Sequence, residues 1–131
     1  MKKIGILNSE ISRVISELGH TDKIVICDSR LPIPSHVKRI DLALKQGVPS
    51  FMDCLVTVLQ EMQVEQAFVA LEMNQKSPEL KKEMELAMEG VTVHELSHEE
   101  LKALTHDAKA IIRTGEFTPY ANVILQAGVI F

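Results

Sequence analysis

The stretch LGHTDKIVICDSRLP, residues 18–32, places a short apolar run between two ionisable side chains. The run is IVIC, residues 24–27, and an unbroken run of this kind is typical of a strand buried on both faces. His20 stands before the run, and Asp28 follows it directly. The arrangement fits an ordinary capped strand, and it also fits an acid and a base held on either side of a small substrate.

A helix precedes this strand and an irregular loop follows it. In residues 9–18 the apolar side chains recur at the spacing of one helix face. Asn8 or Ser9 is suited to cap the start of this helix, and Gly19 is suited to a left-handed conformation at its end. The segment DSRLPIPSHV, residues 28–37, contains prolines that exclude a regular helix.

Further from this centre, helices and strands alternate along the chain. The predicted helices cover residues 50–62, 78–89 and 98–104, and the predicted strands cover residues 38–42, 66–72, 91–96, 109–116 and 121–128. This order predicts an α/β fold, with one layered domain over residues 1–131 and a mostly parallel sheet flanked by helices. Such sheets bind ligands beyond the carboxyl ends of their strands, so Asp28 and the loop after it form a candidate pocket rim.

Composition narrows the class of protein. Hydrophobic residues make up 46% of the 131 residues, which indicates a globular chain. The net charge of −4, the absence of tryptophan and the lack of a basic patch argue against nucleic-acid binding. No apolar run approaches the roughly 18 residues that cross a membrane, and the N-terminus lacks a signal-peptide core, so we expect a cytoplasmic protein. Cys27 and Cys54 lie in apolar surroundings, which favours buried, reduced thiols.

Each ionisable residue of the opening stretch has two interpretations. His20 fits a solvated residue after a helix end, and it also fits a general acid or base, because histidine exchanges protons near neutral pH. Asp28 fits a turn-forming residue that accepts hydrogen bonds from the amides after it. It also fits a group that orients a histidine or binds a sugar hydroxyl.

The segment HELSH, residues 94–98, formally matches the H-E-x-x-H pattern of zinc peptidases. That function requires both histidines on one face of a continuous helix. Here VTV before the motif favours a strand, and Ser97 is suited to cap a new helix inside it. We therefore expect no zinc site, and His98 becomes the first residue of a helix at the carboxyl end of a strand.

Polar and turn-forming residues are dense in RTGEFTPYANVIL, residues 113–125. The segment fits a hairpin connection between two strands, with its tyrosine packed on the loop. Tyr120 and Asn122 also suit a hydroxylated ligand, because a phenol and an amide both donate and accept hydrogen bonds.

Several segments together resemble the ribose and fucose mutarotase family, and TPYAN is closer to its ribose branch. They are GILN, LGHTDKIVICD, IDLAL, SHEE, IRTGEFTPYAN and LQAGVIF, and they run from one end of the chain to the other. The resemblance implies an isomerase that interconverts the pyranose and furanose forms of D-ribose without a metal or organic cofactor. It also implies a cytoplasmic homo-oligomer, typically a decamer, with the sugar site between neighbouring subunits.

The resemblance also implies roles for individual residues. The catalytic histidine of the family matches His20, and its substrate-binding residues match Asp28, His98, Tyr120, Ala121 and Asn122, the alanine through its backbone. Ring opening takes a proton from the anomeric hydroxyl and gives one to the ring oxygen. One histidine with hydrogen-bonding partners suits that chemistry.

One position departs from the family pattern. Small residues usually follow the aspartate of the family, in the pattern D-A-G-[LM]-P, whereas this chain has Ser29 and Arg30. If position 30 has a positive φ, arginine carries a steric cost of roughly 1–2 kcal/mol. Its charge suits an anionic ligand or a pair with Asp28, or the side chain points to solvent. The alternatives are a mutarotase for a different or phosphorylated sugar, and a sugar-binding or regulatory module without turnover.

The spacing of His20 and Asp28 carries a further expectation. They stand at opposite ends of one strand, and at about 3.3 Å per residue they lie on the order of 20 Å apart. That is too far for both to hold one pentose within a subunit. We expect His20 of one subunit to meet Asp28 of a neighbour, unless the loops fold back strongly.

Overall fold

The apolar run of the opening stretch forms the central strand of the fold. In the computed structural model, which describes all of residues 1–131, this strand is β1 (Lys23–Cys27), and its last four side chains have no exposed surface. β5 (Ala110–Arg113) pairs with β1 in parallel, and β6 (Val123–Ala127) pairs with it in antiparallel orientation. Burial on both faces explains why the run contains no polar residue.

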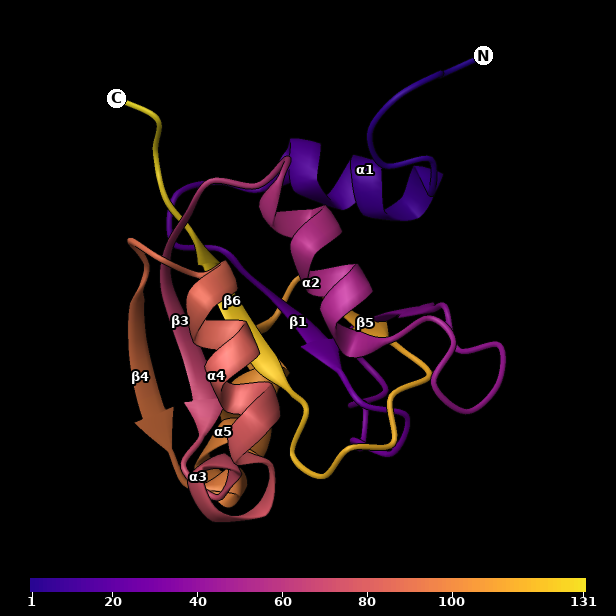
Figure 1. The fold of residues 1–131 in the computed structure, drawn as a ribbon. Helices are drawn as coiled ribbons and strands as arrows, with labels where there is room; N and C mark the ends of the chain where they lie inside the picture. The colour runs from indigo at the N-terminus through magenta and orange to yellow at the C-terminus, as the bar shows by residue number, and fades with distance from the viewer.

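Six strands form one mixed sheet (Figure 1). β2 (Lys38–Asp41) lies beside β5, while β3 (Val64–Ala70) and β4 (Thr92–Leu96) extend the sheet beyond β6. The strand order is β2-β5-β1-β6-β3-β4, and every pair is parallel except the two that β6 makes. The predicted α/β fold with a mostly parallel sheet is confirmed, with one reversed strand near its centre.

Helices pack around this sheet. They are α1 (Ser9–Glu17), α2 (Phe51–Leu59), α3 (Met73–Lys76), α4 (Pro78–Ala87) and α5 (His98–Leu104), followed by a 3₁₀ turn (Thr105–Asp107). In Figure 1, α2 and α4 lie in front of the sheet, whereas α5 is drawn behind α4 and packs on β3. None of these helices has the length and apolar character that crossing a membrane requires.

Side-chain caps start three of the predicted helices, whereas α4 begins at Pro78 without one. Asn8 caps α1, and Ser50 caps α2. Ser97 and Glu100 cap α5 reciprocally, each side chain accepting the other residue's backbone N–H. The break inside HELSH is therefore confirmed, because His94 lies in β4 while His98 begins α5.

The turn after α1 differs from the expectation. Gly19 is not in the left-handed region; Thr21 is, with φ 74°. The N–H of Gly19 donates to Asp22 Oδ2 at 2.8 Å, so a side chain closes this turn in place of a glycine conformation.

Strand direction decides which loops meet. In Figure 1 the arrows of β1, β3 and β4 point towards the lower edge of the sheet, whereas β6 points upwards. The segment that enters β6 therefore lies at the edge where β1 and β4 end, which we call the carboxyl edge. At the opposite edge, called the amino edge, β1 and β3 begin and β6 ends.

Candidate functional site

A pocket opens at the carboxyl edge, between the loop after β1, the start of α5 and the segment that enters β6. Its volume is about 230 Å³, and its walls are Asp28, Arg30, Leu31, Pro32, His98, Pro119 and Tyr120. The structure thus brings three of the predicted site residues, Asp28, His98 and Tyr120, onto one cavity. Polar groups that converge in a concave site are the usual mark of a small-molecule pocket.

Hydrogen bonds on two sides hold Asp28 in place. Its Oδ1 accepts the backbone N–H groups of Arg30 at 2.9 Å and Leu31 at 2.8 Å. Its own backbone N–H donates to Asn122 Oδ1 at 2.9 Å, and its Oδ2 accepts from Asn122 Nδ2 at 3.4 Å. The turn-forming role of Asp28 is confirmed, and Oδ2 retains capacity to accept a further hydrogen bond.

Ala121 and Asn122 lie behind the pocket wall, and both are fully buried. The side chain of Asn122 is engaged with Asp28, and its backbone N–H donates to the carbonyl of Tyr120 at 2.8 Å. Within one chain, Asn122 therefore links the aspartate of the pocket to its tyrosine.

His98 enters the pocket as the first residue of α5. The Glu72 carboxylate accepts its backbone N–H, at 3.1 Å from Oε1 and 3.0 Å from Oε2. A carboxylate at a helix N-terminus is favourable because it meets the positive end of the helix dipole. The imidazole Nδ1 is buried without a hydrogen-bond partner, which marks the ring as a group with unused polar capacity.

Tyr120 packs against His98 in the pocket wall, and the two rings meet edge to face, with centroids 5.1 Å apart. Tyr120 has φ 61°, a left-handed conformation that costs a residue with a side chain roughly 1–2 kcal/mol. The buried Ser77 hydroxyl donates to the carbonyl of Pro119 at 2.9 Å and so fixes the preceding peptide. The surrounding structure thus enforces the backbone turn that presents the tyrosine ring.

Arg30 lies on the rim of the same pocket. Its φ is not positive, so the steric cost considered for this position does not arise. Its guanidinium stacks over the ring of Phe117, 5.0 Å from the ring centroid, and it forms no ion pair with Asp28. The Phe117 ring therefore holds the positive charge of Arg30 in position, and the guanidinium remains free to bind a ligand.

His20 lies at the amino edge, away from this pocket. Its Nε2 is 2.9 Å from Glu65 Oε2, and Gln126 Nε2 donates to Glu65 Oε1 at 2.8 Å. The pairing of Lys23 with Gln126 and of Ile26 with Val123 confirms that the two ends of β1 face opposite ends of β6. Within one chain, His20 and Asp28 therefore lie at opposite edges of the sheet.

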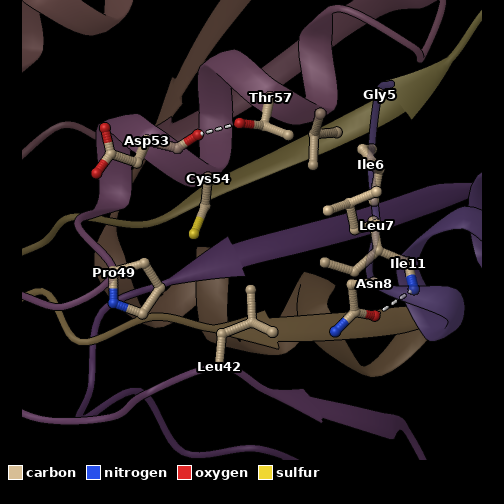
Figure 2. A pocket seen from close by; sticks show the side chains of 11 residues that line it. Gly5, Ile6, Leu7, Asn8, Ile11, Leu42, Pro49, Asp53, Cys54 and Thr57 are labelled. Atoms are coloured by element: carbon tan, nitrogen blue, oxygen red, sulfur yellow. Dashed lines mark hydrogen bonds between the residues drawn. The ribbon is translucent and has the colours of Figure 1, made fainter. Parts of the chain in front are cut away.

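A second cavity of similar volume, about 230 Å³, lies between the N-terminal segment and α2 (Figure 2). Two of its polar side chains are engaged within α1 and α2: Asn8 Oδ1 accepts the N–H of Ile11, and Thr57 Oγ1 donates to the carbonyl of Asp53. The Asp53 side chain also lines the cavity. Burial raises the pKa of the Cys54 thiol to about 11, so it is protonated at neutral pH. This cavity offers mainly apolar surface, an inert thiol and one carboxylate, whereas the carboxyl-edge pocket brings together a carboxylate, an imidazole and a phenol.

Three supporting residues escaped the sequence analysis: Glu65, Glu72 and Ser77. Each acts on a site residue far away in sequence, namely His20, His98 and Pro119 respectively. Glu72 follows β3 at the carboxyl edge, so strand order was the signal that would have found it. For Glu65 and Ser77 no local signal exists, since both contacts depend on tertiary packing.

The histidines, cysteines and carboxylates include no group of three placed to hold a metal ion. His94 of the HELSH segment instead lies 2.9 Å from Gln66 Oε1 and stacks on Phe68.

Comparison with known proteins gives the same family over nearly the whole chain. Residues 1–130 match the RbsD / FucU transport protein family. The chain is 56% identical to a D-ribose pyranase of Shouchella clausii and 53% identical to one of Bacillus subtilis, in both cases over the full length of both proteins.

Solved structures agree with these relatives. Bacillus subtilis RbsD complexed with D-ribose superimposes with a TM-score of 0.97, at 53% identity and full coverage of both chains. The fucose mutarotase of Streptococcus pneumoniae, in complex with L-fucose, has a TM-score of 0.80 at 25% identity over 95% of each chain. With this fold and this extent of identity, the chain belongs to the RbsD/FucU family.

Proposed function

We propose that this chain is a D-ribose pyranase, a cofactor-free isomerase that interconverts the pyranose and furanose forms of D-ribose. The observation that carries the proposal is the carboxyl-edge pocket, where Asp28, His98 and Tyr120 converge. Support comes from the relative at TM-score 0.97, which was solved with D-ribose, and from full-length relatives that bear the name D-ribose pyranase.

The reaction requires proton transfers and hydroxyl positioning. A proton leaves the anomeric hydroxyl and one reaches the ring oxygen; the open aldehyde then closes through a different hydroxyl. In our proposal His20 is the catalytic residue that moves these protons, a step worth about 10²–10⁴-fold in rate. Asp28, His98 and Tyr120 bind sugar hydroxyls, and the buried pair Ala121 and Asn122 completes the binding segment behind them.

The separation of His20 from Asp28 supports a site shared between subunits. Each site would take His20 from one subunit and the carboxyl-edge pocket from its neighbour. We propose a homodecamer as the assembly, the cytoplasm as its location and ribose catabolism as its role. Residues 1–131 act in it as a single mutarotase-like domain.

Saturation-transfer NMR on D-ribose tests the activity directly, because it measures exchange between anomers at equilibrium. We expect the protein to accelerate exchange between pyranose and furanose signals, and His20→Ala to remove about 10²–10⁴-fold of that acceleration. The His20→Ala protein should keep the oligomeric size of the wild type. Ribose binding without acceleration in the wild type would instead indicate a sugar-binding module.

Arg30 favours a second candidate substrate, a phosphorylated pentose. Its guanidinium is on the pocket rim, supported by Phe117 and without a carboxylate partner. Arginine is well suited to bind phosphate because its planar donors match phosphate oxygens. Ribose 5-phosphate cannot form a pyranose because its 5-hydroxyl is esterified, so NMR on this sugar follows exchange between its α- and β-furanose signals. Acceleration of that exchange favours the phosphorylated sugar, and acceleration of ribose exchange alone favours ribose.

A further inference from the structure

We infer that Glu65 is a positioning residue for His20, holding its imidazole with one nitrogen bound and the other presented to the sugar. The inference rests on the proposed function, in which His20 moves the protons. Glu65 does not line the carboxyl-edge pocket, and nothing in its own sequence neighbourhood points to catalysis. Its role follows from the geometry of the amino edge.

The contacts of Glu65 use both carboxylate oxygens. Oε2 is 2.9 Å from His20 Nε2, and Oε1 accepts a hydrogen bond from Gln126 Nε2 at 2.8 Å. A carboxylate only accepts hydrogen bonds, so a neutral His20 must carry its proton on Nε2. Nδ1 is then the nitrogen with a free lone pair, and it is the atom able to take a proton from a sugar hydroxyl.

The sheet is deformed at this position. β3 and β6 pair Val64 with Ala127 and Gln66 with Gln126, so Glu65 is an extra residue that has no partner in β6. Such bulges re-aim one side chain and occur often beside active sites. The side chain of Glu65 therefore does not follow the alternation of β3 side chains between the two faces of the sheet, and it points to His20.

Gly128 provides the space that this arrangement needs. A Cβ atom at position 128 would lie 2.9 Å from Glu65 Cβ, closer than side-chain carbons approach one another. The N–H of Gly128 also donates to the carbonyl of Gln63 at 3.0 Å, which ties the end of β6 to the start of the bulged strand.

The turn that carries His20 is equally well fixed. Thr21 has φ 74°, a left-handed conformation that is unfavourable for threonine. Two backbone hydrogen bonds enforce it: Thr21 N–H donates to Ala127 O at 3.0 Å, and Ala127 N–H donates to Asp22 O at 2.8 Å. The histidine is thus held against Glu65 by the same end of β6 that supplies Gln126.

The charge of Glu65 completes the device. Hydrogen bonds from Gln126 and then from His20 lower the pKa of Glu65 below its ordinary value of 4.5, so it is ionised at neutral pH. A fixed negative charge beside the ring stabilises the imidazolium that forms when Nδ1 accepts a proton. Because 53% of the His20 side chain is exposed, the opposite side of the ring remains accessible to a sugar held by another subunit.

Glu65→Gln is the direct test, because an amide has one acceptor oxygen where the carboxylate has two. The amide places an NH2 donor where one of those oxygens stood, so in this geometry it cannot accept from both Gln126 and His20, and the proton on His20 should redistribute between the ring nitrogens. We expect the rate of ribose exchange to fall about tenfold to a hundredfold with little change in sugar affinity. Glu65→Asp, which keeps two acceptor oxygens, should retain more activity than Glu65→Gln, and Glu83→Gln on exposed α4 is the matched control.

A second readout does not depend on activity. The protein has five histidines, so ¹⁵N,¹³C-histidine labelling gives few imidazole signals, and His20→Ala identifies the relevant one. We expect the Nε2–H tautomer for His20 in the wild type and Glu83→Gln, and a shift away from it in Glu65→Gln. Gly128→Ala, which leaves Glu65 chemically intact, should reproduce the shift by displacing the carboxylate.

The outcomes separate the two claims. An unchanged tautomer in Glu65→Gln, or unchanged exchange despite a changed tautomer, would overturn the positioning role. If the wild type accelerates no sugar exchange, the proposed function fails, while the tautomer comparison still decides whether Glu65 sets the protonated nitrogen of His20.

Discussion

Arg30 is the residue that gives this pocket a charge open to ligands. A guanidinium stacked on Phe117 is held in place by the flat face of the ring and keeps its donors free. The aspartate beside it forms no ion pair with this guanidinium, which stacks over Phe117 while Asp28 Oδ1 accepts the backbone N–H groups of Arg30 and Leu31. Ribose and its phosphate should therefore depend on Arg30 to different degrees.

We predict that Arg30→Ala keeps the affinity for D-ribose within about twofold of the wild type and lowers the affinity for ribose 5-phosphate about tenfold or more. The reason is that a hydrogen bond to a charged group contributes about 1.5–3 kcal/mol, and only the phosphate would receive one from this side chain. Isothermal titration calorimetry with both sugars measures the difference. Arg39→Ala, on the exposed side of β2, is the control, and equal weakening of both sugars by Arg30→Ala would contradict the prediction.

Ser77 acts on the pocket through the backbone of its neighbour. Ser77→Ala removes the hydrogen bond to the Pro119 carbonyl. We expect a loss of about 1–3 kcal/mol in the free energy of unfolding, because a part-buried acceptor loses its partner. KM for ribose should rise more than kcat falls, since the tyrosine segment loosens. Urea denaturation and exchange kinetics measure the two effects, with Ser16→Ala in exposed α1 as the control.

At the scale of elements, the segment between β5 and β6 organises the carboxyl edge. Glu116 anchors it: Oε1 accepts the N–H of Phe51 at the start of α2 at 2.9 Å, and Oε2 accepts from the hydroxyl of Thr118 at 2.8 Å. Burial works to raise the pKa of Glu116, but the hydrogen bonds from Phe51, Thr118 and Phe117 outweigh it, and the net shift is downward. The ionised carboxylate therefore stabilises the fold.

This shift predicts a pH dependence. Because the folded pKa lies below the ordinary value of 4.5, the stabilisation is fully present above pH 4.5 and is lost as the pH falls through the folded pKa. Glu116→Gln should lower the free energy of unfolding by about 1–2 kcal/mol at pH 7, and this difference from the wild type should become smaller in acid. Thermal or urea unfolding from pH 7 to pH 3 measures both; a constant gap would contradict the assignment.

The elements were predictable where the signal is local. Ser50 and Ser97 act within their own helix turns, and the IVIC run needs only its apolar character, so these boundaries follow from the sequence. The place of β6 in the sheet was not predictable: a hairpin connection would pair it with β5, whereas β1 lies between these two strands. The short α3 was also missed, since its four residues are too few to show a helical period.

The candidate site divides in the same way. Asp28, His98 and Tyr120 were predicted, and the structure gathers them on one pocket. The bulge at Glu65 depends on the pairing of two strands far apart in sequence, and Thr21, not the nearby glycine, adopts the left-handed conformation. Such features follow from packing, which is not visible in one stretch of sequence.

At the scale of the whole molecule, the two groups of candidate site residues lie at opposite edges of the sheet. The amino edge holds His20 with Glu65, and the carboxyl edge holds the pocket with Asp28. On the proposed function, each active site combines the amino edge of one subunit with the carboxyl edge of a second subunit.

Mixing two inactive variants tests this arrangement. His20→Ala and Asp28→Asn should each be inactive alone, whereas a randomly assembled one-to-one mixture should recover about a quarter of the sites, because one intact half must meet the other. Co-expression followed by NMR exchange measurement gives the recovered fraction. Absence of recovery in mixed oligomers confirmed by mass spectrometry would show that each site lies within one subunit.

β6 connects these two edges. Asn122, just before its first residue, holds Asp28, while Gln126, near its end, holds Glu65. A chain built in this way has a head and a tail, and subunits joined head to tail leave an unfinished site at each end of any open row. On the proposed function, closure of such a row into a ring completes every site, so we expect activity per subunit to fall when dilution opens the rings.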